Sequence, residues 1–305
     1  MRTRPLGDGG PAVSAVGLGC NNFGRRCDLE QTRAVVDAAL VAGVTLLDTA
    51  DVYGGGQSED FLGRILEGRR DRVVLATKFG HEMPGGPDVP HGSRGWIRWA
   101  CAQSLQRLRT DVIDLYQYHR PDGVTPLEET LGAMNELVGE GKVRFLGCSN
   151  FTPEQVEEAE RIAREHGWSR FVSAQNRYSF VEREAEDELL PTCERLGIGV
   201  LPYFPLASGL LTGKYTRGVQ PTEGRLAAHP DALSDEAFDR VEALQAFADE
   251  RGIALLEAAI GGLLAMPAVT SVIAGATRPE QVRANVAAGA WEPSPEDAAA
   301  LKALR

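Results

Sequence analysis

The stretch Gly-Val-Thr-Leu-Leu-Asp-Thr-Ala-Asp-Val-Tyr, residues 43–53, is the strongest indication of the fold, because it leads from a buried strand to two reactive side chains. The apolar run Val44–Leu47 is typical of a buried strand. Asp48 ends that run, and a carboxylate at such a place needs a partner. Tyr53 follows in a short loop, before the glycine run Gly54–Gly56 and a predicted helix. An acid and a phenol therefore lie at or just past the C-terminal end of one strand.

Two more predicted strands end in side chains of the same kind. Lys78 follows the strand Val73–Thr77, and His119 follows the strand Val112–Tyr118. Taken singly, such residues are more often helix caps, solvated lysines or structural histidines. A closed parallel barrel, however, would bring all these strand ends to one rim. The candidate catalytic residues are therefore Asp48, Tyr53, Lys78 and His119.

Strand and helix signals alternate along the chain after residues 3–12, a glycine-rich segment that suits a small hairpin. We expect eight strands, at Val13–Leu18, Val44–Leu47, Arg72–Thr77, Val112–Tyr118, Val143–Cys148, Phe171–Ala174, Ile198–Pro202 and Val269–Ile273. Helices separate them; one is expected to start near Asp28, and two are expected to be capped by Thr125 and Thr152. The pattern predicts an α/β protein, a (β/α)8 TIM barrel with an N-terminal β-hairpin and extra C-terminal helices.

The composition excludes several classes of function. The 305 residues carry 32 Lys and Arg against 43 Asp and Glu, a net charge of −11, which disfavours binding to nucleic acid or an anionic membrane. No apolar run is long enough to span a bilayer, and Met1–Pro11 has no signal-peptide pattern, so we expect cytoplasmic residence. The five cysteines form no Cys-x-x-Cys pair. We therefore predict no disulfide scaffold and no metal site.

The four candidate residues suit the reduction of a carbonyl group. Tyrosine is a poor acid near neutral pH, with an ordinary pKa of about 10, and a nearby ammonium lowers that value. Lys78 would supply the charge, and Asp48 would hold the lysine in place. His119 would bind the carbonyl oxygen, and Tyr53 would deliver the proton. Protein side chains cannot supply hydride, so this chemistry requires a cofactor.

Four separated motifs, in the right order, resemble those of the aldo-keto reductase family. They are Asp48–Gly54, Leu75–Gly80, Asp114–Pro121 and Lys142–Phe151. The resemblance runs from Leu6 to about Asn285 and implies a single barrel domain over residues 1–305, with the four candidate residues as its catalytic tetrad. It also implies a small-molecule carbonyl substrate, an aldehyde or a ketone, and NADPH bound along the C-terminal rim without a Rossmann fold.

The same resemblance implies cofactor contacts at individual positions. Ser149, Asn150 and Gln175 are similar to the residues that bind the nicotinamide carboxamide. Tyr203 is similar to the aromatic residue that stacks on the nicotinamide ring. The other positions belong to a loop over the pyrophosphate and a loop at the adenosine phosphate; they are Leu206, Ser208, Gly209, Leu210, Lys214, Gly275, Thr277, Arg278, Gln281 and Asn285.

Two of these positions depart from many reductases, which have a lysine where Gly275 stands and an arginine where Gln281 stands. This pattern resembles the bacterial general-reductase and potassium-channel β-subunit branches more closely. Arg278 is then the candidate charge for the 2′-phosphate of NADPH. One charge-assisted hydrogen bond, roughly 1.5–3 kcal/mol, predicts a preference for NADPH of about ten- to hundredfold. NADP is therefore the predicted cofactor, with NAD as a weaker ligand.

Two other classes of protein stay open. A regulatory protein of the channel β-subunit type would keep the cofactor and act through a partner, but it has no need of the full tetrad. A barrel hydrolase or lyase would need paired carboxylates or metal ligands at strand ends, and the sequence offers neither. We expect substrate choice to depend on the loops Gly80–Gly92, Arg120–Thr125 and Leu210–His229 and on the C-terminal tail, with Phe23 beside the pocket.

Overall fold

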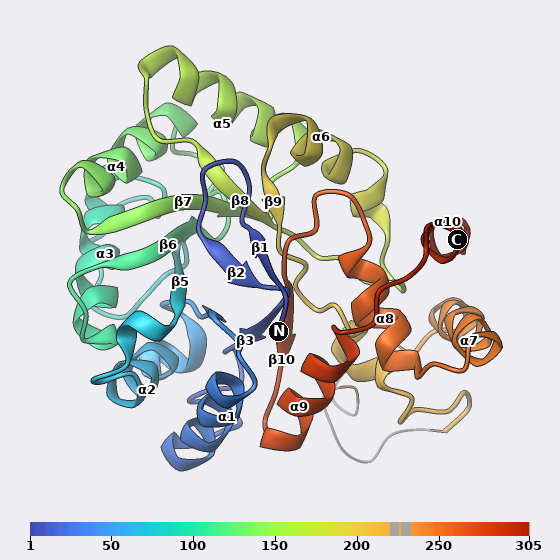
Figure 1. Cartoon of the computed structure of the whole chain (residues 1–305). Coiled ribbons are helices and arrows are strands. Elements are labelled where there is room, and N and C mark those ends of the chain that lie inside the picture. Colours follow the sequence, from blue (N-terminus) through green and yellow to red (C-terminus); the bar gives the residue numbers. More distant parts are fainter. Residues whose placement is uncertain (220–225, 227–232, 305) are drawn as a thin grey trace.

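Eight parallel strands form the centre of the computed structural model, which describes residues 1–219, 226 and 233–304 (Figure 1). The strands are β3 (Val16–Gly19), β4 (Leu46–Asp48), β5 (Val74–Phe79), β6 (Ile113–Tyr118), β7 (Val143–Ser149), β8 (Phe171–Gln175), β9 (Gly199–Val200) and β10 (Val272–Gly275). They pair in the order β10-β3-β4-β5-β6-β7-β8-β9. The two ends of this order meet where the Val200 N–H donates to Ala268 O at 2.7 Å and the Thr270 N–H donates to Val200 O at 3.0 Å. The predicted (β/α)8 barrel is confirmed.

Helices form a layer outside the strands (Figure 1). They are α1 (Leu29–Val41), α2 (Gln57–Ile65), α3 (Arg94–Leu108), α4 (Leu127–Gly139), α5 (Pro153–His166), α6 (Leu189–Leu196), α7 (Asp235–Glu250), α8 (Leu255–Leu264), α9 (Pro279–Ala288) and α10 (Pro295–Ala303). Both α7 and α8 precede β10, and α10 follows α9, so the extra C-terminal helices are also confirmed. No helix among the described residues is long and apolar enough to cross a membrane.

One of the two predicted helix caps, Thr152, is confirmed, and α1 begins directly after Asp28 as expected. Asp28 and Thr152 each accept a hydrogen bond from the backbone N–H three residues further on, within a capping box. The prediction that Thr125 caps α4 is wrong, because Pro126 is the residue before α4 and the Thr125 hydroxyl donates a hydrogen bond to Asp122 at 2.7 Å. The Asp122 carboxylate organises the loop before α4, and Thr125 is part of that loop.

Strand boundaries at the two ends of the chain differ from the predictions. Val13, expected in the first barrel strand, pairs with Arg4 in the hairpin formed by β1 (Thr3–Pro5) and β2 (Ala12–Ser14). The last strand, predicted at Val269–Ile273, starts at Val272 and ends at Gly275. Short apolar runs show that a strand exists, but its limits depend on which partner strand supplies the hydrogen bonds.

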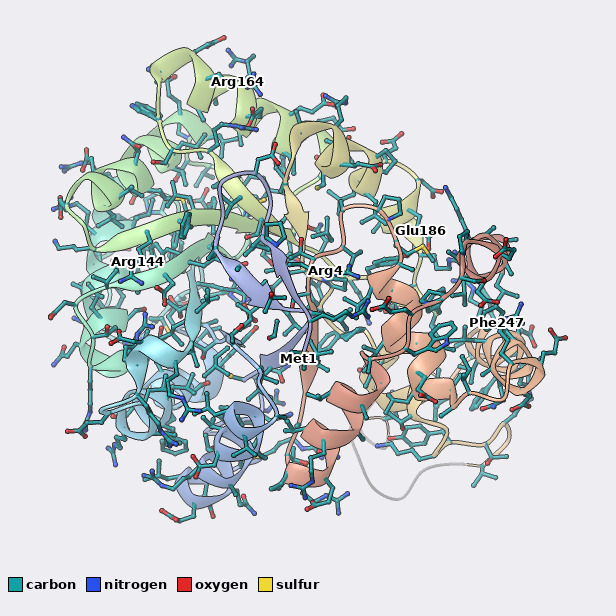
Figure 2. The ribbon with its side chains drawn as sticks, in the orientation of Figure 1. Met1, Arg4, Arg144, Arg164, Glu186 and Phe247 are labelled. Atoms are coloured by element: carbon teal, nitrogen blue, oxygen red, sulfur yellow. The ribbon has the colours of Figure 1, made fainter. Side chains whose placement is uncertain are left out.

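The hairpin covers the N-terminal end of the barrel. The Asp8 N–H donates to Gly197 O at 2.7 Å, just before β9. Arg4, labelled in Figure 2, donates to Leu264 O at 2.6 Å and to Val269 O at 3.0 Å. Below the hairpin, a small apolar core fills the barrel; its buried members are Leu6, Val13, Leu46, Ala76, Leu115, Val172, Leu201 and Ile273. With this end closed, the C-terminal ends of the strands form the open rim.

The interpretation of residues 1–305 as a single domain stays a prediction. The expected long loop after β9 contains a 3-10 turn at Ala207–Thr212. Its later part, and with it much of the loop Leu210–His229, lies outside the described residues.

Candidate active site

A cleft of about 490 Å³ opens on the C-terminal rim of the barrel. Most of the predicted site residues line it: Asp48, Tyr53, His119, Ser149, Asn150, Gln175, Tyr203, Leu206, Ser208, Gly209, Lys214, Gly275, Thr277, Gln281 and Asn285. Three do not. Lys78 is fully buried behind the wall, Leu210 is buried in the apolar core, and Arg278 is exposed at the start of α9.

Lys78, in β5, lies at the centre of the predicted tetrad. Its Nζ donates to Asp48 Oδ2 at 2.7 Å and to Thr49 O at 2.8 Å, and it lies 3.5 Å from Tyr53 Oη. The lysine side chain is completely buried. A buried ammonium is stable only when it is paired and hydrogen-bonded, and these three contacts meet that condition. The structure therefore brings together the aspartate, the lysine and the tyrosine.

Asp48 is held by neighbours on other strands. Its Oδ1 accepts from Gln117 Nε2 at 3.1 Å and from Gln175 Nε2 at 2.9 Å, while Oδ2 bonds to Lys78. Three strands thus supply donors to one carboxylate. These bonds hold the Asp48 carboxylate in the position where it bonds to Lys78.

A glycine turn places Tyr53 against Lys78. Tyr53 is followed by Gly54, which has a φ of 60°, and Gly55, which has a φ of 65°. A Cβ at Gly54 would lie 2.8 Å from Phe23 O, so this tight turn requires glycine. Phe23 itself is fully buried in the core, and the expectation that it borders the pocket is wrong.

The pKa of Tyr53 differs from the expectation. Burial raises it above its ordinary value of 10, and the opposing effect of the Lys78 ammonium is smaller. For Lys78, burial lowers the pKa, but Asp48 and Tyr53 together outweigh burial and leave the pKa raised. At neutral pH the site therefore contains a protonated phenol beside a charged ammonium.

His119 follows β6 and completes the cluster as a neutral imidazole. Its ring meets the edge of Tyr53 at a centroid distance of 5.9 Å, and His81 packs against it at 4.6 Å. Burial, with the charges of Lys78 and Arg120, lowers the pKa of His119 to about 2. Its Nδ1 is buried and has no hydrogen-bond partner among the described residues. A neutral imidazole can donate a hydrogen bond into the cleft.

Asn150 is hydrogen-bonded to two other residues predicted to contact the nicotinamide, Ser149 and Tyr203. Its Nδ2 donates to His119 O at 2.9 Å and to Ser149 Oγ at 3.1 Å, and its Oδ1 accepts from the Tyr203 hydroxyl at 2.8 Å. The asparagine has a φ of 58°, which is uncommon for a non-glycine residue. Both ends of its amide are used within the protein. The side chain therefore holds His119 and Tyr203 in position.

The loop after β9 bends sharply along the cleft. Phe204, Ala207 and Ser208 have φ values of 51°, 45° and 57°, and Gly209 follows at 101°. Such clustered left-handed residues mark strained, functional backbone, and turns of this kind present successive N–H groups to anions. A Cβ at Gly209 would come within 3.2 Å of Lys214 Nζ, so the lysine ammonium lies directly over this turn.

On the side of β10, the start of α9 closes the cleft. Gln281 Oε1 accepts from the Thr277 N–H at 2.7 Å and from the Thr277 hydroxyl at 3.1 Å. The loop after β3 packs on this turn, where Cys27 Sγ donates to Thr277 O at 3.9 Å. That loop brings Arg26 into the cleft wall, whereas Arg278 stays outside it.

Sequence reasoning missed several residues of the cleft wall. They are Asn21, Asn22, Arg26, His81, Arg120, Phe204 and Thr212. His81 and Arg120 belong to loops that were expected to influence substrate choice, but neither was named as a site residue. Each missed residue lies in a segment that follows a barrel strand. The tetrad was found because a barrel brings the ends of its strands to one rim, and the same reasoning could have found these residues. Among the described residues, no three His, Cys, Asp or Glu side chains gather as metal ligands.

The fold and the site together define a class of (β/α)8 barrel proteins with a buried aspartate–lysine pair, a tyrosine and a neutral histidine at the C-terminal rim. The model of the Aldo/keto reductase family matches residues 15–305. The chain therefore belongs to the aldo/keto reductase family, oxidoreductases that generally use NAD(P)H and act on small carbonyl compounds.

Similar proteins include reductases and channel subunits. A probable voltage-gated potassium channel subunit beta from Arabidopsis thaliana is 35 % identical over 299 residues, covering 94 % of this chain and 91 % of the plant protein. The L-glyceraldehyde 3-phosphate reductase of Escherichia coli strain K12 is 34 % identical, covering 94 % and 87 %. Probable aldo-keto reductase 1 of Glycine max is 36 % identical over 251 residues, covering 78 % and 71 %.

Proposed function

We propose that this protein is an NAD(P)H-dependent oxidoreductase that reduces aldehydes or ketones to alcohols, with Tyr53 as the proton donor. The observation that carries the proposal is the fully buried Lys78, which bonds to Asp48 at 2.7 Å and lies 3.5 Å from Tyr53 Oη. Burying this charge is costly. An ammonium buried beside the protonated phenol of Tyr53, at an open cleft, is suited to proton transfer from that phenol.

Each residue of the tetrad has a role in this proposal. The carbonyl oxygen binds near Tyr53 Oη and accepts a hydrogen bond from the neutral His119 ring. Tyr53 donates its proton to that oxygen as negative charge develops there. The Lys78 ammonium stabilises the phenolate that remains, and Asp48 keeps the lysine charged and in place. The bound nicotinamide cofactor supplies the hydride.

The residues of the rim suit such a cofactor. Among the described residues, the Ser149 hydroxyl proton and Gln175 Oε1 have no hydrogen-bond partner, so they offer one donor and one acceptor, as a carboxamide requires. The Asn150 bond fixes the Tyr203 ring beside them. At the other end, the turn at Ser208 and Gly209, with Lys214, suits phosphate groups. We propose NADPH as the preferred cofactor, with NADH as a weaker ligand.

A second candidate rests on the Arabidopsis relative, whose name describes a potassium channel subunit. A regulatory protein of this type would bind the cofactor and show weak turnover. The complete tetrad supports the enzyme instead. The name of the Escherichia coli relative makes glyceraldehyde 3-phosphate one of the aldehydes to test. Residence in the cytoplasm stays a prediction.

The test is the loss of nicotinamide absorbance when NADPH or NADH is mixed with the protein and a panel of neutral and charged aldehydes. We expect turnover with at least one aldehyde. Lys78→Met should abolish most of it, because the Lys78 ammonium, which lowers the pKa of Tyr53 against the effect of burial, would be gone. Cofactor binding without turnover of any aldehyde would favour the regulatory candidate.

A further inference from the structure

Arg120 is a cation of the cleft wall that the proposed mechanism leaves without a role. It follows His119 directly, after the end of β6, and lines the cleft together with Tyr53, His81 and His119. Burial is the main cause that lowers the pKa of His119 and of His81, and the charge of Arg120 lowers both further. The guanidinium therefore lies close to the part of the cleft where the carbonyl binds.

The strand order separates Arg120 from the other cations of the cleft. In the closed ring of eight strands, β6 stands four places from β10 in both directions. Arg26 follows β3 and Lys214 follows β9, the two neighbours of β10. These two cations flank the loop of Thr277 and Gln281, where the phosphates of a dinucleotide are expected. Arg120 stands on the opposite side of the rim.

The Arg120 guanidinium is not neutralised. It is exposed, and it forms no ion pair with any residue that the structure describes. The nearest carboxylate in sequence, Asp122, already accepts hydrogen bonds from Gly92, Val124 and Thr125. Among the residues that the structure describes, the one acidic side chain that lines the cleft is Asp48, which is paired with Lys78. An acidic chain with a net charge of −11 thus presents an unpaired cation beside its reactive tyrosine.

We propose that Arg120 is a specificity-determining residue that binds an anionic group, a phosphate or a carboxylate, on the carbonyl substrate. This inference rests on the proposed reductase function. The planar guanidinium binds both kinds of group through paired, charge-assisted hydrogen bonds. Because Arg120 is adjacent in sequence to His119, the anionic group of a preferred substrate lies only a few bonds from its carbonyl carbon. The preferred substrates are short anionic aldehydes or ketones.

Matched substrate pairs test this inference by steady-state kinetics with NADPH. One pair is glyceraldehyde 3-phosphate and glyceraldehyde, and the other is succinic semialdehyde and butanal. We expect kcat/KM to be about ten- to hundredfold higher for the anionic member of at least one pair, mainly through a lower KM. The pair that shows the preference distinguishes a phosphate from a carboxylate.

Variants assign the preference to Arg120. Arg120→Ala should reduce the anionic-to-neutral ratio of kcat/KM to near one by raising KM for the anionic member, and Arg120→Lys should restore part of it. Arg25→Ala removes an exposed charge that does not line the cleft, and it should keep the wild-type ratio. As a second readout, inorganic phosphate should compete with the anionic aldehyde in the wild type and compete more weakly in Arg120→Ala.

The outcomes separate the two proposals. Turnover of neutral aldehydes with no anionic preference, or a preference that survives in Arg120→Ala, would overturn the role of Arg120 and leave the reductase function standing. Failure of the wild type to reduce any of the four aldehydes would contradict the reductase function, and the role of Arg120 with it.

Discussion

Lys78 shows how a single residue combines stability and chemistry in this protein. Its position after a predicted strand was visible in the sequence, as were the positions of Asp48, Tyr53 and His119. The structure adds that the ammonium is completely buried and bonded to Asp48 Oδ2 at 2.7 Å. Loss of the carboxylate would leave an unpaired buried charge, which is strongly destabilising. The pair therefore contributes to the fold as well as to the proposed reaction.

Tyr53→Phe tests the proton donor. The substitution keeps the ring and removes only the hydroxyl that lies 3.5 Å from Lys78 Nζ. Because general acid catalysis contributes about 10²- to 10⁴-fold, we expect kcat for aldehyde reduction to fall by at least about a hundredfold. The dissociation constant of NADPH, measured by fluorescence quenching, should stay within about twofold, because the Tyr53 hydroxyl is not among the groups expected to bind the cofactor.

Tyr116→Phe is the matched control for that experiment. Tyr116 is fully buried in β6, away from the cleft, and its hydroxyl has no partner among the described residues. Its removal should leave kcat unchanged. Near-native turnover by Tyr53→Phe at neutral pH would mean that water or His119 donates the proton.

At the scale of elements, the loops after the strands determine what the rim can bind. The strand-end rule identified the tetrad, but it does not show which loop residues turn inward. Arg278 was predicted from resemblance to contact the 2′-phosphate, yet it is exposed at the start of α9 and does not line the cleft. Arg26 lines it instead, because the loop after β3 packs against Thr277. Which arginine lines the cleft therefore depends on contacts between loops that are distant in sequence.

Two alanine variants, with a third as control, compare the arginines that could bind a cofactor phosphate. We expect Arg26→Ala to weaken NADPH binding by about ten- to hundredfold, the effect of losing one charge-assisted hydrogen bond. Arg278→Ala and the control Arg25→Ala should change it by no more than about twofold. Titration with NADH distinguishes the phosphates, since a loss restricted to NADPH indicates the 2′-phosphate. A larger loss for Arg278→Ala would support the original prediction.

The capping box of α5 gives a prediction about stability. Thr152 accepts a hydrogen bond from the Gln155 N–H, and the Gln155 side chain accepts one from the Thr152 N–H at 2.9 Å. Thr152→Ala should lower the free energy of unfolding by about 1 kcal/mol, as the loss of an N-cap side chain does. Denaturant unfolding measures this change. An unchanged midpoint would show that packing alone holds the start of α5.

At the scale of the whole molecule, an acidic chain surrounds a cleft with positive side chains. Of the 305 residues, 43 are Asp or Glu, but in the described part of the chain Arg26, Arg120 and Lys214 line the cleft and Asp48 is the one acidic residue beside them. The overall charge disfavours polyanionic partners, while the local charge attracts small anions. The net charge of the chain therefore disfavours nucleic acid and anionic membranes, while the charge of the cleft favours small anionic ligands.

The burial of His119 makes the stability of the protein depend on pH. The pKa of His119 is about 2 in the folded protein, mainly because of burial, and about 6.5 in the unfolded chain. Below pH 6.5 the unfolded state binds a proton that the folded state does not. The free energy of unfolding should therefore fall as the pH falls from 6.5 to 5, by up to about 1.4 kcal/mol per pH unit.

Unfolding at several pH values, for the wild type and His119→Asn, measures that contribution. The variant should lose the part of the slope that His119 causes, although His81, whose pKa is also lowered by burial, should retain some of it. Equal slopes for the wild type and His119→Asn would mean that the pKa of His119 is the same in the folded and unfolded states.

The sequence by itself determined the barrel, the hairpin, the extra helices and the strand ends at which the tetrad stands. These features depend on local hydrophobic periodicity and on residue order, both of which can be seen along the chain. Tertiary structure alone decided that Tyr53 has a raised pKa, that Asn150 bonds to Tyr203, and that Arg26 lines the cleft while Arg278 does not. Each of these depends on the removal of water, or on distances between residues far apart in the sequence, and only the folded chain sets them.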